Sequence, residues 1–158
     1  MVFWCGEKGI VLSYKGQEIE MKQLSGIFLM LASKVAMAAV SVHVFVSFSM
    51  PDPLLIQTFR EAEKLKLPVY INGLHNNSMK LTAKKVMEYT KEVPDLSLQI
   101  DPTLFEQYGI SQVPAVVVDN GKAFDVIYGN LKLKECLKRI ESLGESGFES
   151  QSLKERQA

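Results

Sequence analysis

Hydrophobic and polar positions along residues 40–143 follow two alternating patterns, which predict strands and helices in turn. Short runs of β-branched, aromatic and other apolar residues are typical of strands. Such runs predict five strands, at residues 42–48, 69–71, 96–100, 115–118 and 123–128. The run at 115–118 is apolar throughout, which is typical of a strand at the centre of a sheet. Asn120-Gly121 after it predicts a hairpin turn.

Between these strands the apolar residues recur at helical spacing. This spacing predicts helices at residues 53–65, about 78–91, 102–108 and 131–143. Asp52 and Asp101 each precede a proline, and an acidic N-cap followed by proline is a common helix start. One face of the second helix is expected to carry Met79, Ala83, Val86, Met87 and Thr90.

The order of these elements predicts an α/β domain over residues 39–143, with a central mixed sheet and helices on both of its faces. The last two strands are expected to form an antiparallel edge of that sheet. Residues 144–158 are polar and predict a flexible tail.

Residues 21–38 have the features of a secretory signal. Met21-Lys22-Gln23 supplies a short positive start, a mostly apolar stretch follows, and Ala36-Met37-Ala38 supplies a small-x-small cleavage motif. Cleavage between Ala38 and Ala39 would release an exported chain. If Met21 is the start, residues 1–20 are a wrongly assigned N-terminal extension. Two alternatives remain: a small hairpin with Ile10-Val11-Leu12 as one arm, and a buried N-terminal helix, which Lys34 favours.

Composition and charge exclude several classes of protein. The chain has 158 residues, 18 Lys+Arg and 18 Asp+Glu, so its net charge of zero provides no basic field for nucleic acid. The two cysteines and two histidines lie far apart in the sequence, which argues against a disulfide scaffold or a structural zinc site. No phosphate-binding loop is present, and we expect no metal, cofactor or small-molecule substrate.

The second half of the chain carries a specific series of short motifs. YGISQVP at residues 108–114 is followed by an apolar strand, Asn120-Gly121, a second strand, Gly129 and an amphipathic helix. This order resembles the C-terminal half of the thioredoxin fold. The resemblance implies a cis peptide bond before Pro114, which would place the backbone of Val113 beside the active-site loop. Redox members of that fold carry Cys-x-x-Cys where this chain has residues 50–53, which contain no cysteine. Thiol–disulfide exchange there would therefore lack both its nucleophile and its resolving thiol.

Four segments together are similar to the TrbC-type pilus assembly proteins of F-type conjugative transfer systems. They are VFVSFSMP at 44–51, Gly73-Leu74 after a strand, QIDPTLFEQYGI at 99–110 and VPAVV at 113–117. The resemblance implies a non-catalytic periplasmic protein, made with a cleaved signal, that takes part in assembling the conjugative pilus of Gram-negative donors. It implies other conjugative-transfer and pilus assembly proteins as partners. It also implies contact with the membrane only through the signal segment before cleavage.

The resulting hypothesis is capture of a partner at a groove formed by Ser49-Met50-Pro51, Gly73-Leu74 and Val113-Pro114. Disruption of the Val113-Pro114 segment is expected to weaken that binding. One alternative is a thiol oxidoreductase or isomerase that uses Cys136 alone, although this residue lies on the apolar stripe of the last predicted helix. The other alternative is a structural subunit of the transfer channel without a groove function.

Overall fold

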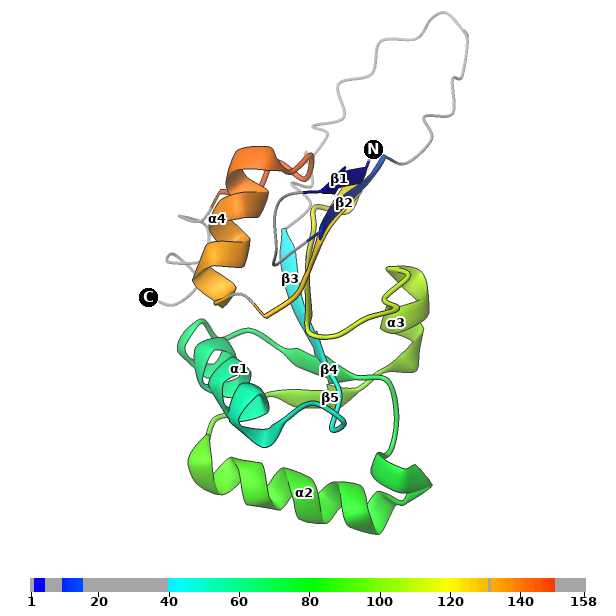
Figure 1. The fold of residues 1–158 in the computed structure, drawn as a ribbon, viewed down its shortest axis with the longest axis vertical. Coiled ribbons are helices and arrows are strands. Elements are labelled where there is room, and N and C mark those ends of the chain that lie inside the picture. The colour runs from blue at the N-terminus through cyan, green and yellow to red at the C-terminus, as the bar shows by residue number, and fades with distance from the viewer. Residues whose placement is uncertain (1, 5–9, 16–39, 131, 150–158) are drawn as a thin grey trace, which may run out of the picture.

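The computed structural model describes residues 2–4, 10–15, 40–130 and 132–149 of the chain (Figure 1). The strands are β1 (Val2–Trp4), β2 (Ile10–Lys15), β3 (Ser41–Val46), β4 (Val69–Ile71), β5 (Leu98–Ile100), β6 (Ala115–Asp119) and β7 (Ala123–Tyr128). The helices are α1 (Asp52–Lys64), the 3-10 turn η1 (His75–Asn77), α2 (Met79–Glu92), α3 (Pro102–Gln107) and α4 (Leu133–Leu143). Each predicted strand and helix of residues 42–143 is present, and the observed ends lie within two residues of the predicted ones.

The strands form one mixed seven-stranded sheet in the order β1-β2-β7-β6-β3-β4-β5. β3 pairs with β4 in parallel and with β6 antiparallel, and Phe45 lies opposite both Tyr70 and Ala115. β4 and β5 are parallel, whereas β6 and β7 form the expected antiparallel hairpin. The β3–β4 crossover, the returning β6–β7 hairpin and the final helix together make the thioredoxin-like arrangement. This confirms the predicted fold class.

One predicted detail of the sheet is wrong. β7 does not form an edge, because β2 pairs with it antiparallel from Val11 opposite Ile127 to Lys15 opposite Ala123. β1 pairs in turn with β2, so the described parts of residues 1–20 form the hairpin that the sequence left as an alternative. Residues 21–38 and the expected cleavage position between Ala38 and Ala39 lie outside the described residues. Within the described part of the chain, no helix is long and apolar enough to cross a membrane.

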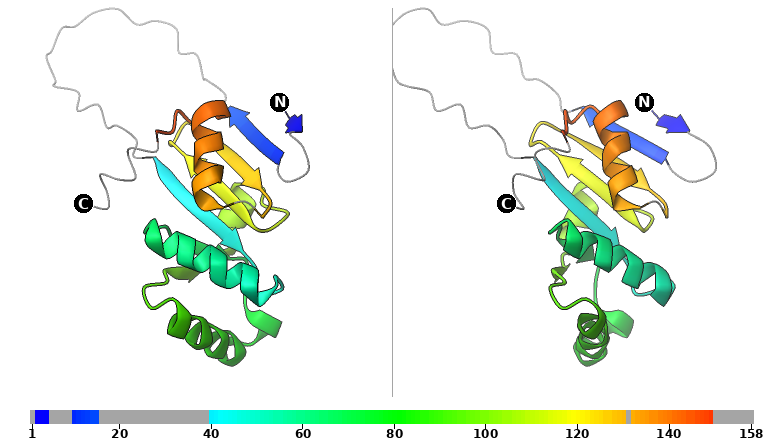
Figure 2. Two further views of the ribbon diagram at one scale, coloured as in Figure 1. Left: turned by 60° about the vertical axis from the view of Figure 1, so that its left-hand side comes forward. Right: turned by 90° about the vertical axis from the view of Figure 1, so that its left-hand side faces the viewer.

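Helices lie on both faces of the sheet, as predicted (Figure 2). α1 and α4 cover one face, and their apolar stripes pack on alternate residues of the central strands, such as Val44 and Val116. α3 covers the other face, where Phe105 and the neighbouring Tyr108 pack against Phe45. The strict alternation along β3 divides its side chains between these two cores, because successive residues of a strand point to opposite faces.

Local capping signals explain where the helices start. The Asp101 carboxylate accepts hydrogen bonds from the backbone N–H groups of Thr103 and Leu104, and Pro102 occupies the first helical position of α3. α1 begins at Asp52, one residue before the expected start, with Pro51 at the N-cap. The carboxylate of Asp52 binds Tyr89 Oη and Lys85 Nζ of α2 instead of capping its own helix.

The predicted flexible tail does not begin at residue 144, since residues 144–149 dock against the domain. Phe148 is only 2% exposed and packs in the core beneath α4. The fully buried carboxylate of Asp125 in β7 accepts hydrogen bonds from the backbone N–H groups of Glu145, at 3.0 Å, and Ser146, at 2.8 Å. Asn120 Nδ2 donates to the Ser146 carbonyl at 2.7 Å. Buried polar partners and one aromatic anchor therefore order a segment whose composition is mostly polar.

Candidate partner-binding site

A hollow of about 400 Å³ opens where the chain leaves β3 and β4. Because these two strands are parallel, their carboxyl ends lie at the same edge of the sheet, and the loops that follow them meet there. The residues that line the hollow are Ser47, Phe48, Ser49, Ile71, Asn72, Gly73, Leu74, His75, Asn76 and Asn77. We refer to this feature as the β3–β4 hollow.

One wall of the β3–β4 hollow is the turn after β3. Ser47 Oγ lies 2.8 Å from Ser49 Oγ and also accepts the Ser49 N–H at 3.2 Å, which fixes both hydroxyl groups at the rim. Phe48 between them is buried and stacks on Tyr89 of α2, with ring centroids 6.0 Å apart and an angle of 10° between the planes. The His75 ring lies almost perpendicular to the Phe48 ring, with the ring centroids 5.8 Å apart. The two serines therefore stand above a fixed aromatic base.

The opposite wall is the loop after β4, which is attached firmly to α2. Asn76 and Asn77 have φ values of +50° and +53°, a left-handed conformation that asparagine adopts more readily than most residues. The backbone N–H of His75 donates to Thr82 Oγ1 at 2.8 Å, and that hydroxyl donates to the carbonyl of Ser78. Ser78 caps α2 through its hydrogen bond from the Leu81 N–H. The asparagines are thus presented by a loop with a defined shape.

The lining of the β3–β4 hollow includes no carboxylate, lysine or arginine. A group of charged and polar side chains outside the lining joins α1 to α2. Hydrogen bonds from Tyr89 and Lys85 hold the pKa of Asp52 below its usual range. Burial raises the pKa of Tyr89, so its hydroxyl remains a donor to that carboxylate at neutral pH. The hollow therefore offers amide and hydroxyl groups over an apolar base.

The structure brings together only part of the groove that the sequence predicted. Ser49, Gly73 and Leu74 line the β3–β4 hollow, while Met50 is buried in the core and the exposed Pro51 caps α1. Pro114, whose peptide bond with Val113 is cis, lines a narrow crevice beside α1 and α4. The separation follows from the sheet order, because β4 and β6 lie on opposite sides of β3. The Val113-Pro114 segment is therefore not part of the hollow's lining.

Several lining residues were not predicted from the sequence. Asn72, Asn76 and Asn77 lie between the predicted strand at 69–71 and the helix predicted from about residue 78, and Ser47 and Phe48 fall within the predicted strand at 42–48. The available signal was their position after two adjacent parallel strands, since loops at carboxyl ends commonly form binding sites in open α/β sheets. Without the pairing of β3 with β4, that signal cannot be read.

Other side chains of types that commonly act in catalysis or metal binding lie away from the hollow. Cys136 in α4 is 1% exposed, and burial raises the pKa of its thiol to about 12. His43 in β3 packs among Tyr70, Tyr108 and Phe45, and burial lowers its pKa. Among the described residues, no cluster of three His, Cys, Asp or Glu side chains is arranged to hold a metal ion.

Comparison with known proteins places these features in context. The family described as type-F conjugative transfer system pilin assembly protein matches residues 44–140, from the middle of β3 through most of α4. The "Periplasmic protein TrbC" of Escherichia coli (strain K12) is 40% identical over 101 residues, which are 64% of this chain and 48% of that protein. The chain thus spans about half the length of this curated relative.

Solved structures show more distant similarity. MTB dsbF matches with a TM-score of 0.48 and 16% identity, over 68% of this chain and 82% of that chain. A putative thiol:disulfide interchange protein DsbE from Chlorobium tepidum matches with a TM-score of 0.44 and 18% identity, over 65% and 77%. StoA from Bacillus subtilis has a TM-score of 0.42 and 13% identity, over 65% and 82%.

Proposed function

The chain belongs to the type-F conjugative transfer system pilin assembly proteins, and from that premise we propose that it is a non-catalytic assembly factor. In this proposal it acts in the periplasm, the location contained in the name of its Escherichia coli relative. It binds a polypeptide segment of another transfer protein in the β3–β4 hollow. Its partners are other conjugative-transfer and pilus assembly proteins.

The uncharged, amide-rich lining of the hollow is the observation that carries this proposal. An extended polypeptide presents a row of N–H and C=O groups, and asparagine side chains can both donate to and accept from such groups. Ser47 and Ser49 can do the same from the facing wall, while Phe48, Ile71 and Leu74 contribute apolar contact. The lack of charge in the lining favours recognition of main chain and neutral side chains.

The state of Cys136 supports the non-catalytic part of the proposal. Thiol exchange requires a thiolate that its substrate can reach. With a thiol pKa of about 12 and a side chain packed beneath α4, Cys136 meets neither condition at neutral pH. It behaves as a small apolar core residue beside Leu133 and Leu137.

Gly73→Trp is the sharpest test, because Gly73 lines the hollow and its position leaves space for a side chain. A Cβ at Gly73 would meet no other atom within 4 Å, and the residue has no positive φ that would oppose a side chain. The matched control is Lys134→Trp, at an exposed position on α4. Both variants are compared for melting temperature and for conjugation frequency and pilus number in donor cells that lack the wild-type protein.

We expect Gly73→Trp to retain the wild-type melting temperature and to lower transfer by about tenfold or more, the loss that removal of one strong contact produces. Lys134→Trp should transfer normally. If a folded Gly73→Trp protein supports normal pilus formation and transfer, binding in the hollow is not the function. Activity of the purified protein in insulin reduction, abolished by Cys136→Ser, would instead support the thiol enzyme.

A further inference from the structure

Helix α2 presents an apolar face that the domain does not use. Over its 14 residues only Thr82 and Tyr89 are buried, and these anchor one side of the helix. Met79 is 63% exposed and Met87 is 67% exposed, whereas Val86, which belongs to the same predicted face, is partly buried and packs against the core. Ala83 lies between the two methionines at four-residue spacing and is also exposed. We call Met79, Ala83 and Met87 the methionine stripe.

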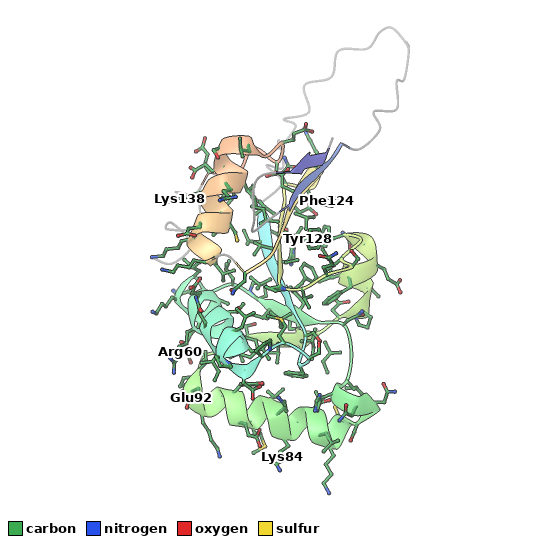
Figure 3. The ribbon with its side chains drawn as sticks, in the orientation of Figure 1. Arg60, Lys84, Glu92, Phe124, Tyr128 and Lys138 are labelled. Atoms are coloured by element: carbon green, nitrogen blue, oxygen red, sulfur yellow. The ribbon has the colours of Figure 1, made fainter. Side chains whose placement is uncertain are left out.

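Three lysines border the methionine stripe, and we call them the lysine row. Lys80 and Lys84 each follow a stripe residue by one position, and Lys91 lies one turn beyond Met87. Glu88 follows Met87 in the same way, so three positive charges and one negative charge lie beside the stripe. The two described ion pairs at this end of the domain involve other residues: Lys85 binds Asp52, and Arg60 binds Glu92. Lys84 projects away from the domain in Figure 3. Among the described residues, none of the three row lysines is within ion-pair distance of a carboxylate.

This arrangement is unfavourable for an isolated helix. Lys80 and Lys84 are like charges at i,i+4 spacing, which destabilises a helix, and Glu88 at the same spacing from Lys84 offsets only part of this repulsion. The exposed methionine side chains remain in contact with water, which is unfavourable for apolar surface. Isolated exposed apolar residues are ordinary, but three of the five large apolar side chains that are exposed in the described chain lie on α2: Met79, Leu81 and Met87. A partner that buries the methionines and places carboxylates beside the lysines would stabilise a surface of this composition.

We propose that the methionine stripe and its lysine row bind an acidic amphipathic helix of another protein. Methionine side chains are flexible and polarisable, so they adapt to an apolar helix face. The lysine row fixes the partner's chemistry, because it complements glutamate or aspartate residues along one edge of the partner's apolar face. α2 is about 21 Å long, which matches roughly four turns of a partner helix.

This surface is distinct from the β3–β4 hollow. Tyr89, which stacks on Phe48 at the base of the hollow, lies on the anchored side of α2, and the methionine stripe lies on a different side. The helix therefore has two roles at once: one side shapes the hollow, and another is free for binding. Variants of the stripe leave the lining of the hollow unchanged, so the two proposals can fail separately.

The test uses isotope-labelled protein and a synthetic amphipathic peptide of about 20 residues, long enough to span α2, with leucines on one face and glutamates beside it. Binding is followed by the backbone amide NMR signals. The triple variant Lys80→Glu/Lys84→Glu/Lys91→Glu is compared with Lys132→Glu/Lys134→Glu/Lys138→Glu, which changes the net charge equally at exposed positions on and beside α4. A second peptide carries lysines in place of the glutamates.

We expect the acidic peptide to shift the signals of residues 79–91, and the α2 triple variant to weaken its binding by about tenfold or more. The α4 triple variant should bind the acidic peptide normally. The basic peptide should bind the α2 triple variant better than it binds the wild-type protein. Equal weakening in both triple variants, or shifts spread over the whole surface, would overturn the proposal, since binding would then reflect net charge alone.

Two other occupants are distinguished in the same set of experiments. If vesicles containing phosphatidylglycerol bind through the lysine row while the acidic peptide does not bind, the surface is a lipid contact and the proposal fails. If the wild-type protein sediments as a dimer that Met87→Glu dissociates, the occupant is a second copy and the proposal also fails. In donor cells, Met79→Ser/Met87→Ser should lower transfer at an unchanged melting temperature. Normal transfer by this folded variant would overturn a role in the assembled system.

Discussion

Substitution of the buried Asp125 is the most decisive test of how residues 144–149 dock against the domain. Its two oxygens receive separate backbone donors, Oδ1 from the Glu145 N–H at 3.0 Å and Oδ2 from the Ser146 N–H at 2.8 Å. Asp125→Asn preserves the size of the side chain but replaces one oxygen with an NH₂ group. That group would face an N–H donor, so one buried amide loses its acceptor and meets a second donor.

The expected loss in the free energy of unfolding follows from this geometry. A hydrogen bond to a charged group contributes about 1.5–3 kcal/mol, and an unsatisfied buried donor costs about 1–3 kcal/mol. Because the segment after α4 can move outward and hydrate its amides, we expect the free energy of unfolding to fall by about 2–4 kcal/mol in Asp125→Asn. For a domain of this size that loss lowers the melting temperature by about 8–16 °C.

Thermal unfolding followed by far-UV circular dichroism measures this shift, with urea unfolding as a second estimate of the free energy. Asp95→Asn in the exposed turn before β5 is the control and should stay within about 0.5 kcal/mol of wild type. The effects of Asp125→Asn and Phe148→Ala should be less than additive, because both release the same segment. A melting temperature for Asp125→Asn within about 2 °C of wild type would refute the reasoning.

Three further outcomes are expected. Gly144→Ala should lower the free energy of unfolding by about 1–3 kcal/mol in urea titrations, because its Cβ would lie 2.3 Å from Asp125 Oδ2; wild-type stability would contradict the packing. Cys136 should resist iodoacetamide at pH 8 in the native protein and react after denaturation, since about one thiol in ten thousand is ionised at a pKa of about 12; rapid native labelling would contradict its burial. Burial lowers the pKa of His43 below its ordinary 6.5, so the contribution of neutral His43 to stability is complete above pH 6.5 and is lost as pH falls through the lowered pKa. His43→Gln should therefore flatten the pH dependence of the free energy of unfolding in urea. An unchanged pH profile would contradict the burial of His43.

Sequence patterns predicted elements well where local chemistry determines them. Asp101-Pro102 and Gly109 delimit α3 through an N-cap, a preset φ and a left-handed C-terminus, all of which depend only on neighbouring residues. The apolar run of β6 could be placed at the sheet centre for the same reason, because few other environments accept four consecutive buried residues.

Patterns failed where a distant partner decides the outcome. In α2 two stripes compete, and the sequence favoured the one with Met79 and Met87. Tyr89 is buried instead because Asp52, Phe48 and Phe59 lie beside it in the fold. Likewise, nothing in the neighbourhood of Asp125 indicates that its acceptors will meet amides 20 and 21 residues later. The β3–β4 hollow was found only in part because it depends on strand pairing.

The position of the docked C-terminal segment has a practical consequence for experiments on this protein. Residues 144–149 lie at the top of Figure 1 with the upper end of α4, whereas α2 lies at the bottom. A tag carried beyond residue 149 is therefore joined to the domain at the end away from α2. A recombinant chain shortened before Phe148 would lose a core side chain, so the tag has to be added beyond the docked segment and not in its place.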